Sequence, residues 1–269
     1  MVVAPHYLAA QAGADVLREG GNAVEAMLAA AASIAVTYPH MNGLGGDNFW
    51  LIHSPDQGLP WAIDACGGAA GIADVGFYYD HNLRSIPGRG PLSAITMAGA
   101  VSGWQNALQL SKQHFGGKIP LRRLLEPAIE HAKNGIPTTN TLANNILNKR
   151  QELELQPGFL EQFLPLGIAP SAGDLFKLPT LAGTLDALAQ AGLQDFYHGD
   201  IAHSLSQELE RAGSPLRRED FDRHRSMEVI PLSLDVAGHR IFNLPPPTQG
   251  IASLILLGIF ERLKITEAE

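Results

Sequence analysis

The residues best suited to do chemistry follow a short apolar segment, where Asp64 and Cys66 are succeeded by Gly67 and Gly68. Cys66 is the single cysteine of the chain, and such a residue can act as a nucleophile when a histidine base lies nearby. No local pattern supports that role, and a small residue that packs in or lines a pocket is the favoured interpretation. Asp64 could orient a substrate amine or cap a turn, and both interpretations stay open here.

The second group of candidates is the glycine-rich run Gly43–Asp47, which contains Gly45 and Gly46. A glycine loop cradles phosphate when a strand precedes it and a helix follows. Here the expected order is reversed, with a helix at residues 23–35 and a strand at residues 48–53. We therefore expect a tight turn that lines a cleft.

The histidines show no spacing typical of a metal site. His198 and His203 are five residues apart, so on a helix they face different directions, whereas helical zinc sites favour a spacing of four. His224 and His239 stand beside charged or turn residues, and we expect both at the surface. The sequence predicts no bound metal.

Composition narrows the class of protein further. The chain has 269 residues, of which 45% are hydrophobic and 17% charged, which is typical of a soluble globular protein. We expect a single domain over residues 1–269. The net charge of −8 argues against nucleic-acid binding, which needs a basic surface. The most apolar stretch, residues 26–36, is shorter than the roughly 20 residues of a membrane span. With no secretory signal visible at the N-terminus, we expect a cytoplasmic protein without membrane contact.

The elements that must position these residues are mostly helical. Asn22 with Glu25 forms a capping-box pattern at the start of an alanine-rich helix. Helices are expected at residues 9–17, 23–35, 101–114, 121–134, 142–155, 181–191, 201–211 and 251–263. Strand pairs are expected at residues 48–53 with 61–64, and 228–236 with 240–244. Helices interrupted by antiparallel strand pairs predict a layered α+β fold.

Five segments, in this order, resemble the γ-glutamyltransferase family. They are Gly20–Ala26, Gly43–Trp50, Thr96–Trp104, Phe196–Ala202 (followed by Glu219-Asp220-Phe221) and Pro245–Gly250. Each match alone is weak, but together they extend over nearly the whole chain. The resemblance implies the αββα sandwich of an N-terminal-nucleophile hydrolase, of which this chain is the helix-rich, incomplete large-subunit part.

The same resemblance implies a mechanism that needs neither metal nor organic cofactor. A proenzyme cuts itself before a threonine, whose hydroxyl attacks an amide carbonyl while its own amine takes the proton. The resulting acyl-enzyme then passes to water or to an acceptor amine. The family's Thr-Thr-His type of start is absent here, and the nearest string, Thr138-Thr139-Asn140, lies between two expected helices. We therefore expect no catalytic residue in this chain, and a partner in the catalytic small subunit of the same proenzyme, with a heterotetramer as one assembly of such pairs.

Substrate specificity is where the chain departs from its family. Glutamyl-specific members hold the substrate α-carboxylate with an arginine after the second strand, because a guanidinium grips a carboxylate bidentately. Cys66 stands at that position, and Gly68 stands where some relatives with other substrates have an arginine. We therefore expect a small amide substrate, as in the similar oxamate amidohydrolases, and not an ordinary γ-glutamyl compound.

Arg84 or Arg89, in the loop 84–90, could supply the positive charge that is missing at positions 66 and 68. The expected substrate-binding residues are Asp64, Cys66, Gly67, Gly45, Gly46 and Arg89. The alternative to an enzyme is a truncated, catalytically inactive fragment that acts at most as a binding or structural partner.

Overall fold

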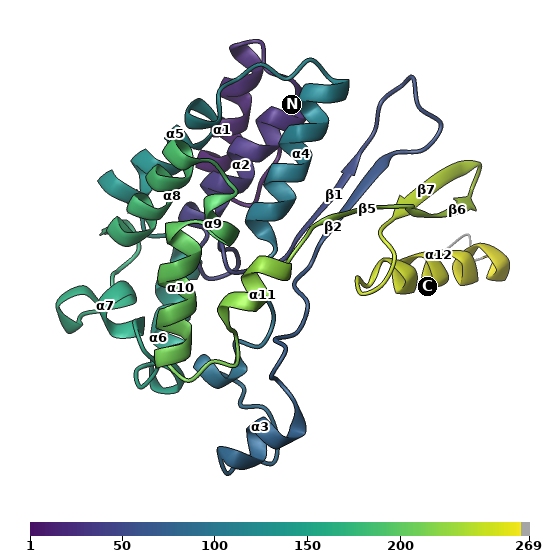
Figure 1. Ribbon diagram of the computed structural model, residues 1–269. Coiled ribbons are helices and arrows are strands. Elements are labelled where there is room, and N and C mark those ends of the chain that lie inside the picture. Colours follow the sequence, from purple (N-terminus) through teal and green to yellow (C-terminus); the bar gives the residue numbers. More distant parts are fainter. Residues whose placement is uncertain (265–269) are drawn as a thin grey trace.

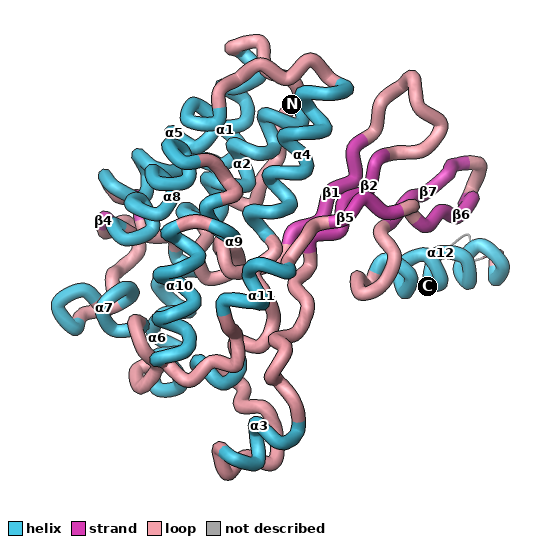
Figure 2. The backbone as a smooth tube through the Cα atoms, viewed as in Figure 1, coloured by secondary structure: helices cyan, strands magenta, loops and turns pink. Residues whose placement is uncertain are grey.

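The computed structural model describes residues 1–264, without the side chain of Leu166. A helical body carries a three-stranded sheet on one side, and a smaller strand–helix unit lies beyond that sheet (Figures 1 and 2). The α-helices are α1 (Tyr7–Arg18), α2 (Ala23–Thr37), α3 (Val75–Asp80), α4 (Ala100–His114), α5 (Leu121–Asn134), α6 (Asn140–Leu153), α7 (Phe159–Phe163), α8 (Pro179–Ala191), α9 (Asp195–His198), α10 (Asp200–Arg211), α11 (Arg218–Arg223) and α12 (Gly250–Leu263). The strands are β1 (Asn48–Ile52), β2 (Trp61–Ala65), β3 (Ile136–Pro137), β4 (Leu175–Phe176), β5 (Met227–Val229), β6 (Leu232–Val236) and β7 (His239–Asn243).

Helix α2 begins at the capping box that the sequence predicts. The Asn22 side chain accepts hydrogen bonds from the Val24 and Glu25 amides at 3.0 Å each. Glu25 is 1% exposed, and one carboxylate oxygen accepts from the Asn22 amide at 2.9 Å. Its other oxygen accepts from the Ile119 amide at 2.7 Å. This single carboxylate satisfies two amides and ties the start of α2 to the segment before α5.

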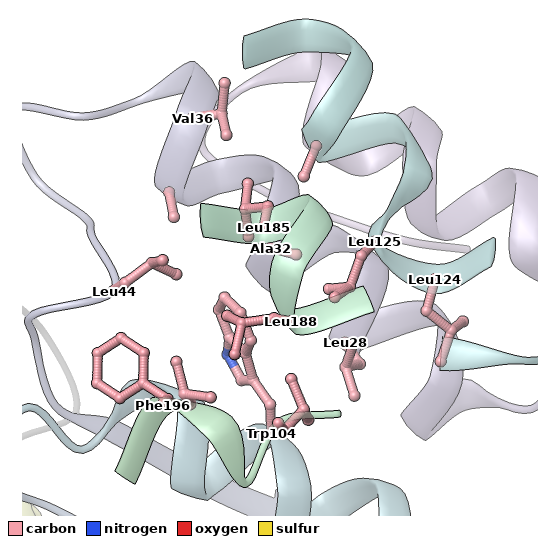
Figure 3. Packing of buried hydrophobic residues seen from close by; sticks show 14 of the residues in the cluster. Leu28, Ala32, Val36, Leu44, Trp104, Leu124, Leu125, Leu185, Leu188 and Phe196 are labelled. Carbon is pink, nitrogen blue, oxygen red and sulfur yellow. The ribbon is translucent and has the colours of Figure 1, made fainter. Parts of the chain in front are cut away.

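The hydrophobic core forms around α2, which packs against α1, α4 and α5. Its alanines let these helices approach closely, while larger side chains fill the remaining volume. Figure 3 shows Leu28, Ala32 and Val36 of α2 beside Trp104, Leu124, Leu125, Leu185, Leu188 and Phe196. Burying each large apolar side chain contributes about 1.5–3 kcal/mol before entropy is counted. Among the described residues, this core cluster has no member from β6, β7 or α12.

The main sheet has the strand order β1-β2-β5, and both strand pairs are antiparallel. Helix α4 packs on β1 and β2. Trp50 and Ile52 of β1 are buried, whereas Phe49 and Leu51 are exposed, as expected from the two-residue period of a strand. The exposed side chains of β1 are therefore apolar, which is unusual for a strand in contact with water, and Asp64 of β2 lies opposite Phe49 on the same face.

The strand expected at residues 228–236 is instead two strands. Met227–Val229 pairs with β2, while Leu232–Val236 pairs with β7 in a separate hairpin. The break falls at Ile230-Pro231, and proline cannot donate a ladder hydrogen bond. The expected continuous strand was wrong for this reason, and the separation brings β5 alongside the main sheet.

Helix α12 packs on the β6–β7 hairpin, with Leu254 buried and Gly258 close to Leu234. Most of its other apolar side chains are exposed: Ile251, Ile255, Leu256, Ile259, Phe260 and Leu263. A helix with this composition is normally covered on all sides. Its outer face is suited to contact with another polypeptide.

Candidate functional site

A groove of about 710 Å³ lies where the segment after β2 faces the segment from α11 to β5. Its lining consists of Asp64, Cys66, Gly67, Gly68, Ala69, Gly71, Met97, Asp220, Arg223, His224, Arg225, Met227, Pro246 and Pro247. Three of the expected substrate-binding residues, Asp64, Cys66 and Gly67, therefore line one groove.

Close backbone packing holds the segment after β2 in place. A Cβ atom on Gly67 would overlap the carbonyl oxygen of Met97, and one on Gly99 would overlap the carbonyl oxygen of Ala65. The Met97 amide donates to the Gly68 carbonyl oxygen at 2.9 Å. Glycine at 67 and 99 is thus required for two backbone segments to run against each other at the floor of the groove.

The glycine-rich run before β1 acts as a turn and as a helix cap. The Gly46 amide donates to the Gly43 carbonyl oxygen at 3.3 Å, and the Gly46 carbonyl accepts from the Gly99 and Ala100 amides at 2.9 and 2.8 Å. The tight turn that the sequence predicts is confirmed. Gly45 and Gly46 do not line the 710 Å³ groove; Gly46 lines a different cavity of about 650 Å³.

Asp47, at the end of that run, links the turn to the groove. Its Oδ1 accepts a hydrogen bond from the Gly67 amide at 2.9 Å. Asp64 makes a similar local contact, because its Oδ1 accepts from the Cys66 amide at 2.9 Å. This contact is the turn-capping alternative for Asp64. Two carboxylates therefore fix the backbone at Cys66 and Gly67.

The same surroundings determine the state of the Cys66 thiol. Burial raises its pKa to about 11, and the hydrogen bond to Asp64 and the charges of Asp64 and Asp47 act in the same direction. The thiol is therefore neutral near pH 7. Since the thiolate is the reactive form, this environment suits a groove-lining residue and does not suit a nucleophile.

The two arginines considered as substitutes for the missing charge lie elsewhere. Arg89 forms an exposed ion pair with Glu152 of α6, with Nε 2.7 Å from the carboxylate. Arg84 lines a separate pocket of about 480 Å³ beside α3. The structure brings neither to the groove that contains Cys66.

Helix α11 and the residues after it form the second wall of the groove, which the sequence did not predict. His224 was expected at the surface, and that prediction was wrong, because its exposure is 9%. Its Nε2 lies 2.8 Å from the Ser102 hydroxyl oxygen, and its ring stacks on Tyr197 at 5.1 Å. Burial lowers the pKa of His224; Arg225 acts in the same direction, and Asp47 opposes it. His239 is exposed, as expected.

Asp220 anchors this second wall. The side chain is buried, and its Oδ1 accepts from the Gly71 amide at 2.9 Å while Oδ2 accepts from the Arg217 amide at 2.8 Å. Asp220 also pairs with Arg223. The signal that could have found this wall was the acidic-aromatic motif Glu219–Phe221, whose carboxylate joins two segments 149 residues apart.

Within residues 1–264, no group of three or more histidine, cysteine, aspartate or glutamate side chains is arranged to hold a metal ion. No helix in that range has both the length and the apolar character needed to cross a membrane.

Comparison with known proteins identifies the family to which this fold belongs. The family model for gamma-glutamyltranspeptidase matches residues 9–269. The computed structure also resembles the crystal structure of Helicobacter pylori gamma-glutamyltranspeptidase, with a TM-score of 0.88 and 27% identity over 97% of this chain and 74% of that one. The chain belongs to the gamma-glutamyltranspeptidase family. The expected fold class, the large-subunit part of an N-terminal-nucleophile hydrolase sandwich, is confirmed.

Three curated relatives show how similar the chain is to named members of the family. The oxamate amidohydrolase proenzyme of Klebsiella pneumoniae is 49% identical over 269 residues, which is all of this chain and 50% of the relative. The glutathione hydrolase-like YwrD proenzyme of Bacillus subtilis is 36% identical over the same shares. The glutathione hydrolase proenzyme of Escherichia coli is 31% identical over 97% of this chain and 45% of its own length. The chain thus spans about half the length of these curated relatives.

Proposed function

We propose that this chain is the large-subunit half of a self-processed amide hydrolase or acyl transferase whose nucleophilic threonine lies in the other half. Family membership and the proenzyme names of relatives twice as long support this division. The chain itself, one domain over residues 1–269 in this proposal, provides a wall of the substrate groove. It needs no metal or organic cofactor for that role.

We further propose a small amide of the oxamate type as the substrate, and not glutathione. The observation that carries this proposal is the neutral Cys66 thiol at the position where glutamyl-specific members have an arginine. A thiol with a pKa of about 11 cannot replace a bidentate, charge-assisted contact with an α-carboxylate. The 49% identity to a protein named oxamate amidohydrolase proenzyme supports the same choice.

The other half of the proenzyme is the proposed partner for the uncovered apolar surfaces. These are the outer face of α12, with Ile255 and Phe260, and the face of β1 that carries Phe49 and Leu51. Burial of these side chains would stabilise the joined halves, and such pairs could assemble into a heterotetramer. A cytoplasmic location is part of the proposal and is tested by fractionation of cells that express the complete gene.

The test is to produce the complete proenzyme, confirm its cleavage into two fragments, and compare substrates. Ammonia release is measured with oxamate and glutamine, and amine release with glutathione and γ-glutamyl-p-nitroanilide. We expect efficient turnover of oxamate and poor turnover of both γ-glutamyl compounds. Efficient cleavage of γ-glutamyl-p-nitroanilide would contradict the proposed specificity.

The competing function, an inactive fragment with a binding role, predicts a different result. In that case the reading frame downstream of residue 269 would contain no threonine cut site, and no amide would be hydrolysed. Expression of residues 1–269 alone is the companion measurement. Full amidase activity in that fragment would show that the nucleophile does not lie in the other half.

A further inference from the structure

The two walls of the groove differ in charge. The wall formed after β2 carries the neutral Cys66 thiol, two glycines and the acidic Asp64. The opposite wall carries two arginines, Arg223 and Arg225, and one carboxylate, Asp220, so its balance is positive. A substrate with a carboxylate would therefore find its cationic partner on the α11 side of the groove and not at residue 66.

Arg223 extends across the groove toward the segment after Cys66. Its Nη2 donates to Oδ1 of the buried Asp220, the same oxygen that accepts from the Gly71 amide. A Cβ atom on Gly71 would lie 2.9 Å from Nη2, so the lack of a side chain there lets the guanidinium lie against the segment after Cys66. The Arg223 side chain remains 65% exposed. It is therefore both oriented by a buried carboxylate and accessible to a ligand.

Arg225 is held by the backbone of its own segment, and its hydrogen bonds do not orient it toward the wall formed after β2. Its Nη1 donates to the backbone carbonyl oxygens of Asp222 at 2.8 Å and His224 at 2.6 Å. In the described part of the chain, Arg223 pairs with Asp220 through one of its nitrogens. A guanidinium has five N–H donors in a planar fork, so Arg223 retains donors for a second carboxylate.

We propose that Arg223 binds the carboxylate of a small anionic amide and so replaces the arginine that is missing at residue 66. This inference rests on the proposed function and names its substrate class: an amide that carries a carboxylate, as oxamate does. Asp220 fixes the plane of the guanidinium, and the carboxylate of the substrate takes the remaining edge. Arg223 is a specificity-determining residue in this scheme, and the attacking group comes from the other half of the proenzyme.

The test uses the complete, processed enzyme and two substrates of nearly equal size, anionic oxamate and neutral oxamide. For Arg223→Gln we expect the KM for oxamate to rise about 10- to 100-fold, the range for loss of a hydrogen-bonded charge. The kcat/KM for oxamide should stay within about twofold, because oxamide has no carboxylate. Arg150→Gln, which removes an exposed arginine of α6 paired with Glu154, is the matched control and should change neither value.

A second variant guards against misfolding, and a second measurement separates this inference from the proposed function. Arg223→Lys retains the charge beside Asp220 but loses the planar guanidinium fork, and should give a KM between the wild type and Arg223→Gln.

Calorimetry with oxalate, which has no amide, should show binding that Arg223→Gln weakens. If the wild type hydrolyses no amide, the proposed function fails while oxalate binding still decides the role of Arg223. Wild-type KM for oxamate and wild-type oxalate affinity in Arg223→Gln would overturn the inference, as would a wild type that does not bind oxalate.

Discussion

Nε2 of His224 lies 2.8 Å from the hydroxyl oxygen of Ser102, in a buried contact between α4 and the residue after α11. A serine hydroxyl beside a histidine can be an activated nucleophile, but the directions of the hydrogen bonds exclude that role for Ser102. Ser102 Oγ also lies 2.7 Å from the Gly99 carbonyl oxygen, to which it donates its one proton. His224 is then the donor to Ser102. The contact joins the wall that contains Arg223 to the turn at Gly99, and its role is structural.

The first prediction concerns stability at acidic pH. Burial lowers the folded-state pKa of His224, so the unfolded chain takes up the proton first as the pH falls. The contribution of a neutral His224 is therefore complete above its ordinary pKa, about 6.5, and is lost as the pH falls from there toward the folded-state pKa. Because His6, His40 and His131 also have lowered pKa values, His224→Gln should reduce the acid sensitivity without abolishing it.

The measurement is the thermal midpoint of the complete enzyme between pH 7 and pH 5. The groups around His224 are Ser102, Tyr197, Arg225 and Asp47, and none of them is changed in the variant. His239→Gln, at an exposed position, serves as the control. An equal loss of thermal midpoint in the wild type and in His224→Gln would rule out the assigned role of burial.

The second prediction tests the close backbone packing at the groove floor. Gly67→Ala should destabilise the protein by about 2 kcal/mol or more, because the added Cβ meets the Met97 carbonyl, which cannot move independently of its chain. Gly68→Ala is the matched control, since a Cβ there meets nothing within 4 Å. It should change the free energy of unfolding by about 0.5 kcal/mol at most. Equal stability of the two variants, measured by denaturant unfolding, would contradict the described packing.

The third prediction concerns the reactivity of Cys66. With a pKa of about 11, the thiol should react slowly with iodoacetamide at pH 8, and the rate should rise about tenfold per pH unit up to pH 10. Peptide mass spectrometry of the labelled protein isolates this residue from cysteines elsewhere in the proenzyme. Rapid stoichiometric labelling at pH 8 with loss of activity would instead point to a reactive thiol.

The fourth prediction concerns the outer face of α12. Ile255→Glu should lower the stability of the processed enzyme by about 2 kcal/mol or more, because assembly with the other half would bury an unpaired charge. Ile255 is 57% exposed in this chain, so the fold of the chain itself should be unaffected. Leu155→Glu introduces the same charge at a site that is 88% exposed and is the control. An Ile255→Glu enzyme that retains wild-type stability would show that this face stays uncovered.

The long helices could be predicted from the sequence because their signals are local. The capping box at Asn22 and Glu25, and the glycine at 135 after α5, mark their ends through backbone groups that neighbouring residues satisfy. The break between β5 and β6 at Pro231 was missed because both halves have the alternation of a strand. Which partner each half takes depends on the whole sheet, and only the tertiary structure shows it.

The sequence by itself determined the family, through ordered motifs, and the resemblance predicted that Cys66 stands where glutamyl-specific members have an arginine. It did not show which cationic side chain lies in the groove with Cys66, because Cys66 and Arg223 are far apart in the sequence. The fold brings the two walls together when Asp220 accepts the Gly71 amide, a contact between residues 149 positions apart. Hydrogen bonds of that range depend on the packing of every element between them, so only the tertiary structure decided that Arg223 faces the groove.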